Sequence, residues 1–364
     1  MPSVVFYISG HGFGHASRQI EIVNALGVAR PDLQIVLRTS APAWLFERTV
    51  RVPFSLIAGA TDTGVVQIDS LRLDEAATVD AAWNFHATLR DRAKREAVLL
   101  REHDARFVIA DAPPLGCAAA SLAGLPCVVI ANFTWDWIYG AYDASGREAS
   151  NLVPVIREAY STADAAWRLP MHGGFASFRS IVDVPFVARH ARHSRPEVRE
   201  RLGLPADRPL VLSSFGGYGV RDLDLSALDC LRSYGVVLTE ADAGPPRDGI
   251  YPIREAAIYD SALRYEDLVA AVDIVITKPG YGIIAECLAN RTALVYTSRG
   301  HFREYDVLVA EMPRFLRCAF LDQDALLAGR WLKALDRVMA SPDPPEQPAT
   351  NGAEVIAAMI AGRV

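Results

Sequence analysis

Short apolar runs, rich in β-branched residues, alternate with longer segments of helical periodicity along the first half of the chain. Runs without polar alternation are typical of strands buried on both faces of a sheet. Apolar residues at helical spacing, such as Ile20, Val23 and Leu26, predict helices between these strands. The strand–helix order predicts a parallel sheet with crossover helices. We expect strands at 4–9, 34–39, 107–111 and 127–132, and helices at 16–29, 75–103 and 115–123.

The second half repeats this order, which predicts a second α/β unit of similar size. A chain of 364 residues is long for one core and sufficient for two domains. We expect an N-terminal domain at 1–187, a C-terminal domain at 188–350 and a terminal helix at 351–364, with the linker near 183–195. The second unit has expected strands at 209–215, 236–240, 273–277 and 292–296, a helical stretch between the first two, and helices near 265–271, at 281–290 and beyond 322.

Composition and charge narrow the class of protein. Hydrophobic residues make up 51% of the chain, enough for a sizeable core, and the net charge of −6 without a dense basic face argues against a nucleic-acid partner. The five cysteines form no CxxC pair, which favours free thiols in a reducing compartment. The first residues do not resemble a signal peptide, and no apolar run reaches roughly 18 residues. We expect a cytoplasmic protein without a transmembrane segment, and the sequence leaves a homodimer open.

The stretch SGHGFGH at 9–15 follows the first predicted strand. Glycines between a strand and a helix allow a tight turn, where backbone N–H groups approach a charged or sugar ligand. Their spacing matches neither the dinucleotide fingerprint GxGxxG nor a P-loop. His11 or His15 suits a general base at the edge of a cleft, or a hydrogen bond within the turn. A metal site needs companion ligands that do not stand out in the sequence, so no metal is expected.

Polar and aromatic residues follow two further strands of the first half. Asp111 ends a predicted strand, where it can orient a histidine, accept a substrate proton or cap the next helix. Trp135, Asp136, Trp137 and Tyr139 follow the strand after that. Aromatic rings beside an acid can hold a sugar ring or another flat ligand, although the same rings can also be buried in the core.

Glycine turns also follow strands in the second half. Gly216 and Gly217 end one strand, and Gly280 and Gly282 open the helix that follows another, where backbone N–H groups can hold a diphosphate. Lys278 adds a positive charge beside the second turn. Glu286 lies on the same helix, where it can take both hydroxyls of a ribose or serve as a favourable acid near the helix N-terminus. His301, Glu304 and Asp306 follow the next strand.

These motifs together resemble the GT-B glycosyltransferases. The chain is more distantly similar to the N-acetylglucosaminyltransferase that acts on the lipid-linked intermediate of peptidoglycan synthesis. It resembles more closely the N-terminal, glycosyltransferase-like part of plant-type L-arabinokinases. The residues that carry this resemblance are GHGFGHASR (10–18), VVQIDSL (65–71), NFTWDWIY (132–139), RLP (168–170), VDVPFVAR (182–189), FGG (215–217), GYGIIAE (280–286) and F-x-E (302–304).

The resemblance implies two Rossmann-like domains that face each other across a cleft, with a C-terminal helix crossing back to the N-terminal domain. It implies an acceptor-side base at His15 or His11, with Asp111 orienting it. It also implies ribose binding by Glu286. The expected donor-binding set is Gly216, Gly217, Lys278, Gly280, Tyr281, Gly282, Glu286, His301 and Glu304, and the expected acceptor-binding set is Gly12, Phe13, Gly14, Trp135 and Asp136.

The expected activity is inverting, metal-independent transfer of a sugar from a nucleotide-diphosphate sugar, taken as UDP-linked, to an acceptor hydroxyl. No cofactor is expected beyond this substrate. A nucleotide-sugar epimerase or hydrolase, and a nucleotide-sugar-binding protein without turnover, remain alternatives on the same scaffold. The sugar-kinase half of arabinokinases, with its ATP-binding loop, has no counterpart in this sequence, so kinase activity is not implied.

Overall fold

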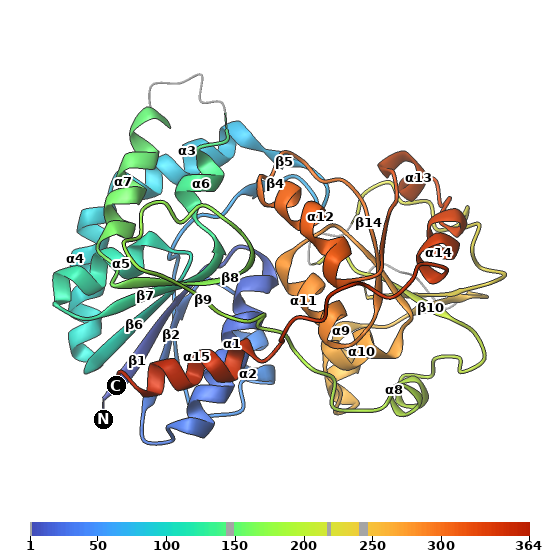
Figure 1. Ribbon diagram of the computed structural model, residues 1–364, viewed down its shortest axis with the longest axis horizontal. Coiled ribbons are helices and arrows are strands. Elements are labelled where there is room, and N and C mark those ends of the chain that lie inside the picture. Colours follow the sequence, from blue (N-terminus) through green and yellow to red (C-terminus); the bar gives the residue numbers. More distant parts are fainter. Residues whose placement is uncertain (1, 143–148, 217–219, 240–246) are drawn as a thin grey trace.

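Two parallel sheets, one in each half of the chain, form the framework of the protein (Figure 1). The computed structural model describes residues 2–142, 149–216, 220–239 and 247–364. The strands of the N-terminal sheet are β1 (Ser3–Ile8), β2 (Gln34–Thr39), β3 (Ser55–Ala58), β6 (Ala105–Asp111), β7 (Cys127–Phe133), β8 (Ala165–Gly173) and β9 (Ile181–Asp183). Their order is β3-β2-β1-β6-β7-β8-β9, and every pair is parallel.

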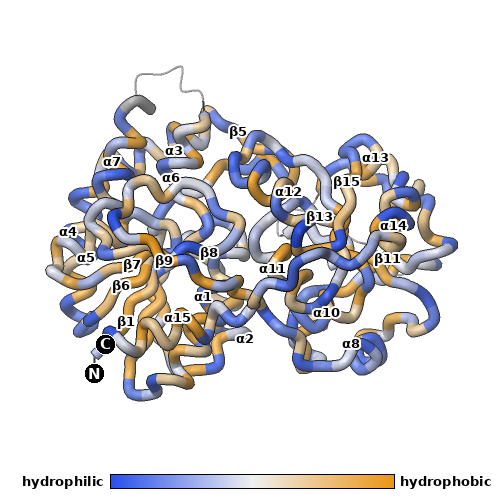
Figure 2. Tube along the Cα trace, viewed as in Figure 1, coloured by the Kyte–Doolittle hydropathy of each residue, from blue (hydrophilic) through white to orange (hydrophobic). Residues whose placement is uncertain are grey.

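The C-terminal sheet has a similar arrangement. Its strands are β10 (Leu210–Ser213), β11 (Gly235–Leu238), β12 (Ile250–Pro252), β13 (Ile274–Thr277), β14 (Ala293–Tyr296) and β15 (Cys318–Phe320). They lie in the parallel order β12-β11-β10-β13-β14-β15. Central strands such as β1, β7 and β13 are buried along their whole length, as their unbroken apolar runs predict, and they form the hydrophobic interior in Figure 2.

Helices cover both sheets, as the alternating pattern predicts. Those of the first half are α1 (Gly12–Ala29), α2 (Ala43–Thr49), α3 (Glu75–His86), α4 (Leu89–Glu102), α5 (Pro114–Ala123), α6 (Trp135–Tyr139) and α7 (Ala149–Ser161). Those of the second half are α8 (Arg195–Arg201), α9 (Glu255–Asp260), α10 (Tyr265–Ala271), α11 (Tyr281–Ala289), α12 (Glu304–Phe315), α13 (Gln323–Leu327), α14 (Leu332–Met339) and α15 (Gly352–Ala361).

Three predictions of local structure were wrong. The predicted helix 75–103 is two helices, α3 and α4, which separate at Ala87 and Thr88 because α3 packs on α7 while α4 packs on α5. The predicted helical stretch before β11 consists of turns through the described residues 220–234, where the Asp224 carboxylate accepts from the amide and hydroxyl of Ser226.

The glycine-rich stretch after β1 was predicted to be a loop up to residue 15, but α1 begins at Gly12. The turn out of β1 needs only residues 9–11, and Gly12, at φ +67°, makes the left-handed step that a side chain would disfavour. His15 is therefore a helical residue. Arg18, one turn further along, lies on the same face of α1.

The predicted return of the C-terminal helix to the N-terminal domain is confirmed, because α15 packs on α1 (Figure 1). The Gly352 amide donates to the Phe186 carbonyl at 2.9 Å, and a Cβ on Gly352 would come within 2.4 Å of the Pro185 carbonyl oxygen. Arg30 donates to the carbonyl of Val364 at 2.6 Å. The predicted domain boundaries at residues 187 and 350 stay predictions.

The order of strands reverses direction beside β1 in the first sheet and beside β10 in the second. Open α/β sheets bind ligands outside the carboxyl ends of the strands at such points. The loop after β1, the start of α1 and the end of β6 bring His11, His15 and Asp111 to the first point. The loops after β10 and β13 bring Gly216 and Lys278 to the second. None of the helices in the described ranges is long and apolar enough to cross a membrane.

Candidate active site between the two domains

His15, Asp111 and Arg18 form a buried charged cluster at the carboxyl ends of the central strands of the N-terminal sheet. Nδ1 of His15 lies 2.9 Å from Asp111 Oδ1, and Arg18 contacts both oxygens of the same carboxylate, Nε at 2.9 Å from Oδ2. Burial alone would raise the pKa of Asp111, but the Arg18 guanidinium and His15 outweigh it and hold that pKa below its usual value. Asp111 is therefore ionised beside the imidazole. Both contacts of His15 within the cluster are made by Nδ1, so Nε2 takes no part in it.

The tautomer of His15 depends on which neighbour Nδ1 bonds. A proton on Nδ1 is donated to Asp111, whereas an unprotonated Nδ1 accepts from Arg18 Nη2, also at 2.9 Å. With the proton on Nδ1, Nε2 is an acceptor, which is the form that a general base requires.

The cluster continues across the domain interface. Arg18 Nη1 donates to Asn132 Oδ1 at 2.7 Å, and Asn132 Nδ2 donates to Glu304 Oε1 at 2.7 Å. Asn132 lies near the carboxyl end of β7 in the first domain, whereas Glu304 begins α12 in the second, and both are buried. A continuous chain of hydrogen bonds thus joins the base candidate His15 to a predicted donor-binding residue.

A second buried carboxylate, Asp62, lies behind the histidines. It accepts from the Ser9 hydroxyl at 3.0 Å and from the Trp135 indole at 2.8 Å. Burial raises the pKa of Asp62 to about 6, against the opposing effects of His15 and of its hydrogen-bond donors. Asp62 fixes the orientation of Trp135, whose ring stacks on that of Tyr139 with centroids 5.1 Å apart.

His11 lies among aromatic rings drawn from both domains. Its ring centroid is 6.0 Å from that of Trp135 and 6.3 Å from that of Phe302, which comes from the C-terminal domain. Burial, the neighbouring His15 and the cations Arg299 and Lys278 hold the pKa of His11 well below its usual value. His11 is therefore a neutral imidazole near pH 7.

Lys278 and Arg299 place positive charge at the carboxyl ends of β13 and β14. Burial, together with the nearby Arg299, lowers the pKa of Lys278 to about 7. Arg299 lies over the Phe302 ring at 4.4 Å, and its only hydrogen bond within the described ranges goes to the Pro279 carbonyl at 3.3 Å. Among the described residues, neither side chain has a carboxylate within ion-pair distance.

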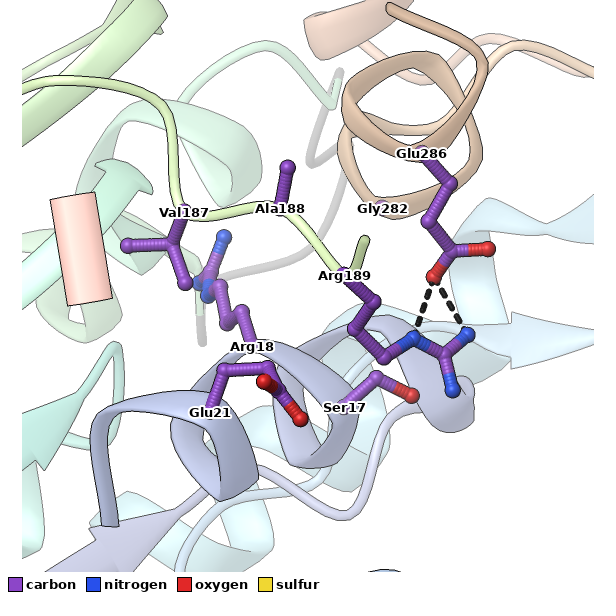
Figure 3. A pocket seen from close by; sticks show the side chains of 8 residues that line it. All are labelled: Ser17, Arg18, Glu21, Val187, Ala188, Arg189, Gly282 and Glu286. Carbon is purple, nitrogen blue, oxygen red and sulfur yellow. Dashed lines mark hydrogen bonds and ion pairs between the residues drawn. The ribbon is translucent and has the colours of Figure 1, made fainter. Parts of the chain in front are cut away.

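Glu286 lines a small pocket between α1 and α11, shown in Figure 3. Its carboxylate accepts from Arg189, with Nε at 2.7 Å, and Arg189 Nη1 lies 3.4 Å from Glu266. Burial raises the pKa of Glu286, although Arg189 opposes the shift. The residue predicted to bind ribose thus faces the domain interface and holds an arginine of the interdomain linker.

The other predicted donor-binding residues lie in different environments. Gly280 is the N-cap of α11, and Gly282 lies where a Cβ would come 3.4 Å from Gly14 Cα of α1, so the two helix starts face each other. Tyr281 is buried, and its hydroxyl accepts from the Val187 amide at 3.2 Å. His301 is exposed and pairs with Glu75 at 3.3 Å. Gly216 follows β10 at φ +73°, while Gly217 lies outside the described residues.

The predicted acceptor residues fall into two groups, three at the start of α1 and two in α6. Gly12 and Gly14 are exposed, and Phe13 packs edge-to-face on Trp44. Trp135 is fully buried, and Asp136 is buried in an ion pair with Arg157 at 3.0 Å. The two glycines therefore present bare backbone to the interface, whereas Trp135 and Asp136 lie behind it.

Four residues of the site were not predicted: Arg18, Asp62, Asn132 and Arg299. Arg18 could have been predicted if the start of the helix had been known, because a residue three positions after His15 lies on the same helical face. Asn132 and Arg299 lie at or just after the carboxyl ends of strands, as Asp111 and Lys278 do. Asp62 had no signal in the sequence, because it lies in a long connection whose path only tertiary packing decides.

The described residues contain no group of three or more His, Cys, Asp or Glu side chains that could hold a metal ion. The predicted absence of a metal requirement stays a prediction, as do the cytoplasmic location and the homodimer.

Comparison with solved structures defines the fold. UGT2 of Phytolacca americana, solved with UDP-2-fluoro-glucose and pterostilbene, matches with a TM-score of 0.62 at 12% identity, covering 99% of this chain and 94% of that one. MurG of Acinetobacter baumannii matches with a TM-score of 0.52 at 14% identity, covering 99% of each chain. The protein has the GT-B glycosyltransferase fold, as predicted.

Among curated proteins, L-arabinokinase of Arabidopsis thaliana is 32% identical over an aligned length of 364 residues, which is 97% of this chain. The chain spans about a third of the length of this relative, 33%. The resemblance inferred from the motifs is thus confirmed. No protein-family model matches the chain.

Proposed function

We propose that the protein transfers a glycosyl group from a nucleoside-diphosphate sugar, UDP-linked, to a hydroxyl of an acceptor, with inversion at the anomeric carbon. The observation that carries the proposal is the hydrogen-bond chain from His15 through Asp111, Arg18 and Asn132 to Glu304. It brings the candidate base of one domain and a carboxylate of the other to the same interface, which supports the proposal because a transferase must hold acceptor and donor together.

The donor diphosphate would bind beside Lys278 and Arg299, two desolvated cations without a carboxylate partner among the described residues. Backbone N–H groups at the start of α11 would add hydrogen bonds to the same phosphates. Glu304, at the start of α12, would face the sugar. The structure of UGT2 with UDP-2-fluoro-glucose, on the same fold, supports a nucleotide-sugar donor.

In the proposed reaction, the acceptor oxygen attacks the anomeric carbon while His15 Nε2 takes the hydroxyl proton. The new C–O bond forms as the bond between the anomeric carbon and the phosphate oxygen breaks. The nucleoside diphosphate leaves with the bonding electrons, and Lys278 and Arg299 stabilise its charge. Asp111, held ionised by Arg18, stabilises the imidazolium that forms. Because two side-chain cations neutralise the leaving group, we propose that no metal ion is required.

The test combines substrate panels with a histidine variant. Wild-type protein is incubated with UDP-sugars, with and without a pool of sugar and polyol acceptors, and products are separated by mass spectrometry. We expect a glycosylated product only when an acceptor is present. We expect His15→Ala to lower its rate by about 10²–10⁴-fold, while His190→Ala, at an exposed position, retains it.

Two results would contradict the proposal. Full transfer by His15→Ala would remove the base assignment. Conversion of the donor in the absence of acceptor would favour an epimerase or a hydrolase.

A further inference from the structure

The motif VVQIDSL forms a hairpin that leaves the N-terminal domain and lies on the C-terminal domain. Its strands are β4 (Val66–Gln67) and β5 (Leu73–Asp74), which pair antiparallel. In Figure 1 the hairpin lies beside α12, at the junction of the two domains. The glycosyl-transfer scheme leaves this segment without a role.

The hairpin contacts three strand-end loops of the C-terminal sheet. The Ser70 hydroxyl donates to the carbonyl of Phe215, after β10, at 2.5 Å. The Gly300 amide, after β14, donates to the carbonyl of Leu71 at 2.7 Å.

The third contact is made by Lys278, which follows β13. Its Nζ lies 3.4 Å from Gln67 Oε1. The hairpin thus covers the carboxyl ends of β10, β13 and β14. The first two of these strands flank the point where the strand order reverses, which is where such sheets bind ligands.

The tip of the hairpin is held by hydrogen bonds of its own and is anchored by an apolar side chain. Asp69 accepts from the amides of Leu71 and Arg72 at 2.8 and 2.9 Å and from Arg72 Nε at 2.8 Å. Leu71 is buried in the hydrophobic cluster of the C-terminal domain, together with Phe215. A tip held by its own hydrogen bonds can dock and undock as one body.

The base of the hairpin turns next to His11. Gly64 has φ +63°, and a Cβ there would come within 2.6 Å of the His11 ring. The Val65 amide donates to His11 Nδ1 at 3.4 Å. At the other end, Asp74 caps α3 by accepting from the Ala77 amide at 2.9 Å.

We propose that the β4–β5 hairpin is a lid that the N-terminal domain closes over the donor site, and that Gln67 is its residue in contact with the bound nucleoside diphosphate. The proposal rests on the donor site of the proposed function. In the docked position, the Gln67 side-chain oxygen accepts the hydrogen bond of the Lys278 ammonium. Donor entry requires the tip to withdraw from Phe215 and Gly300, and re-docking encloses the donor and excludes water.

A disulfide can hold the lid closed. A Cβ on Gly300 would lie 3.1 Å from Leu73 Cγ, so the pair Leu73→Cys and Gly300→Cys has a geometry suited to a bridge. Four of the native cysteines are buried. The two single variants serve as matched controls, because each carries one change and neither can form the bridge.

Binding of UDP, GDP, ADP and dTDP is measured by surface plasmon resonance on wild type, on each single variant and on the double variant before and after dithiothreitol. For the diphosphate that binds wild type, we expect the oxidised double variant to associate at least tenfold more slowly. We expect reduction to restore the wild-type rate.

Equal association rates for the oxidised and reduced double variant would overturn the lid while leaving the proposed function intact. Failure of the pair to cross-link would also overturn it, because the docked position would then not be populated. If wild type binds none of the four diphosphates, the proposed function is contradicted and the lid with it.

Discussion

The charge of the buried Lys278 side chain is expected to make ligand binding at the candidate site depend on pH. Its pKa, lowered to about 7 by burial and by Arg299, means that half of the free protein lacks this positive charge at neutral pH. A bound diphosphate favours the ammonium form, so binding takes up a proton when pH exceeds this pKa.

We therefore expect the affinity for the nucleoside diphosphate to fall as pH rises above 7, approaching about tenfold per pH unit for one linked proton. Lys278→Arg should remove most of this dependence, because a guanidinium stays charged. Isothermal titration at pH 6, 7 and 8 checks both statements. A wild-type affinity that does not change over this range would show that Lys278 is not a phosphate ligand.

Asp62 has the opposite relation to stability from most carboxylates. Its pKa is raised from 3.8 to about 6 by burial, so the folded state binds a proton that the unfolded state has already lost between these values. The contribution of Asp62 to stability is therefore largest at low pH and declines as pH rises to about 6.

Asp62→Asn keeps an acceptor for the Trp135 indole and removes the buried charge. We expect this variant to gain about 2 kcal/mol of unfolding free energy relative to wild type between pH 4.5 and pH 7.5. Urea unfolding of both proteins at the two pH values provides the measurement. A difference that stays constant with pH would mean that Asp62 is not protonated in this range.

At the scale of elements, the two turns that precede α1 and β4 determine where the histidines lie. Gly64 has a left-handed backbone, and a Cβ added there would come within 2.6 Å of the His11 ring, so Gly64→Ala should both strain the turn and displace His11. Gly124, at φ +70°, has the same backbone region but no atom within 4 Å of an added Cβ.

We expect Gly124→Ala to cost about 1 kcal/mol of stability and to leave transfer unchanged. We expect Gly64→Ala to cost more than this and to lower the transfer rate as well. Thermal unfolding and product formation are measured on both variants. If the two lose the same stability and keep the same activity, the contact between Gly64 and His11 has no functional role.

The sequence predicted the central strands of both sheets because buried parallel strands have unbroken apolar runs, as in β1, β6 and β13. It also placed Asp111 and Lys278 at the carboxyl ends of strands that lie beside the points where the strand order reverses. It missed β3, β8, β9, β12 and β15, four of which are edge strands. It also missed the break between α3 and α4 and the early start of α1, because helix ends depend on packing more than on periodicity. Asp62 and the docking of Leu71 on the other domain depend on long-range contacts that periodicity does not encode.

At the scale of the molecule, several contacts besides the interdomain linker join the two domains within the described residues. Three of these are the bond between Asn132 and Glu304, the docked β4–β5 hairpin and the return of α15 to α1. Two of them lie beside the proposed donor site. We therefore expect ligand binding there to change the contacts between the domains. Undocking and docking of the proposed lid is one such change.

The central claim is that the strand ends of the C-terminal domain bind a nucleoside diphosphate. The most direct measurement is thermal unfolding of wild type and of Lys278→Ala with and without UDP, GDP, ADP and dTDP. At a ligand concentration about 100 times the dissociation constant, binding to the folded state adds about 2.7 kcal/mol. We predict a rise in Tm for wild type with UDP and a clearly smaller rise for Lys278→Ala. No shift with any of the four would contradict the account.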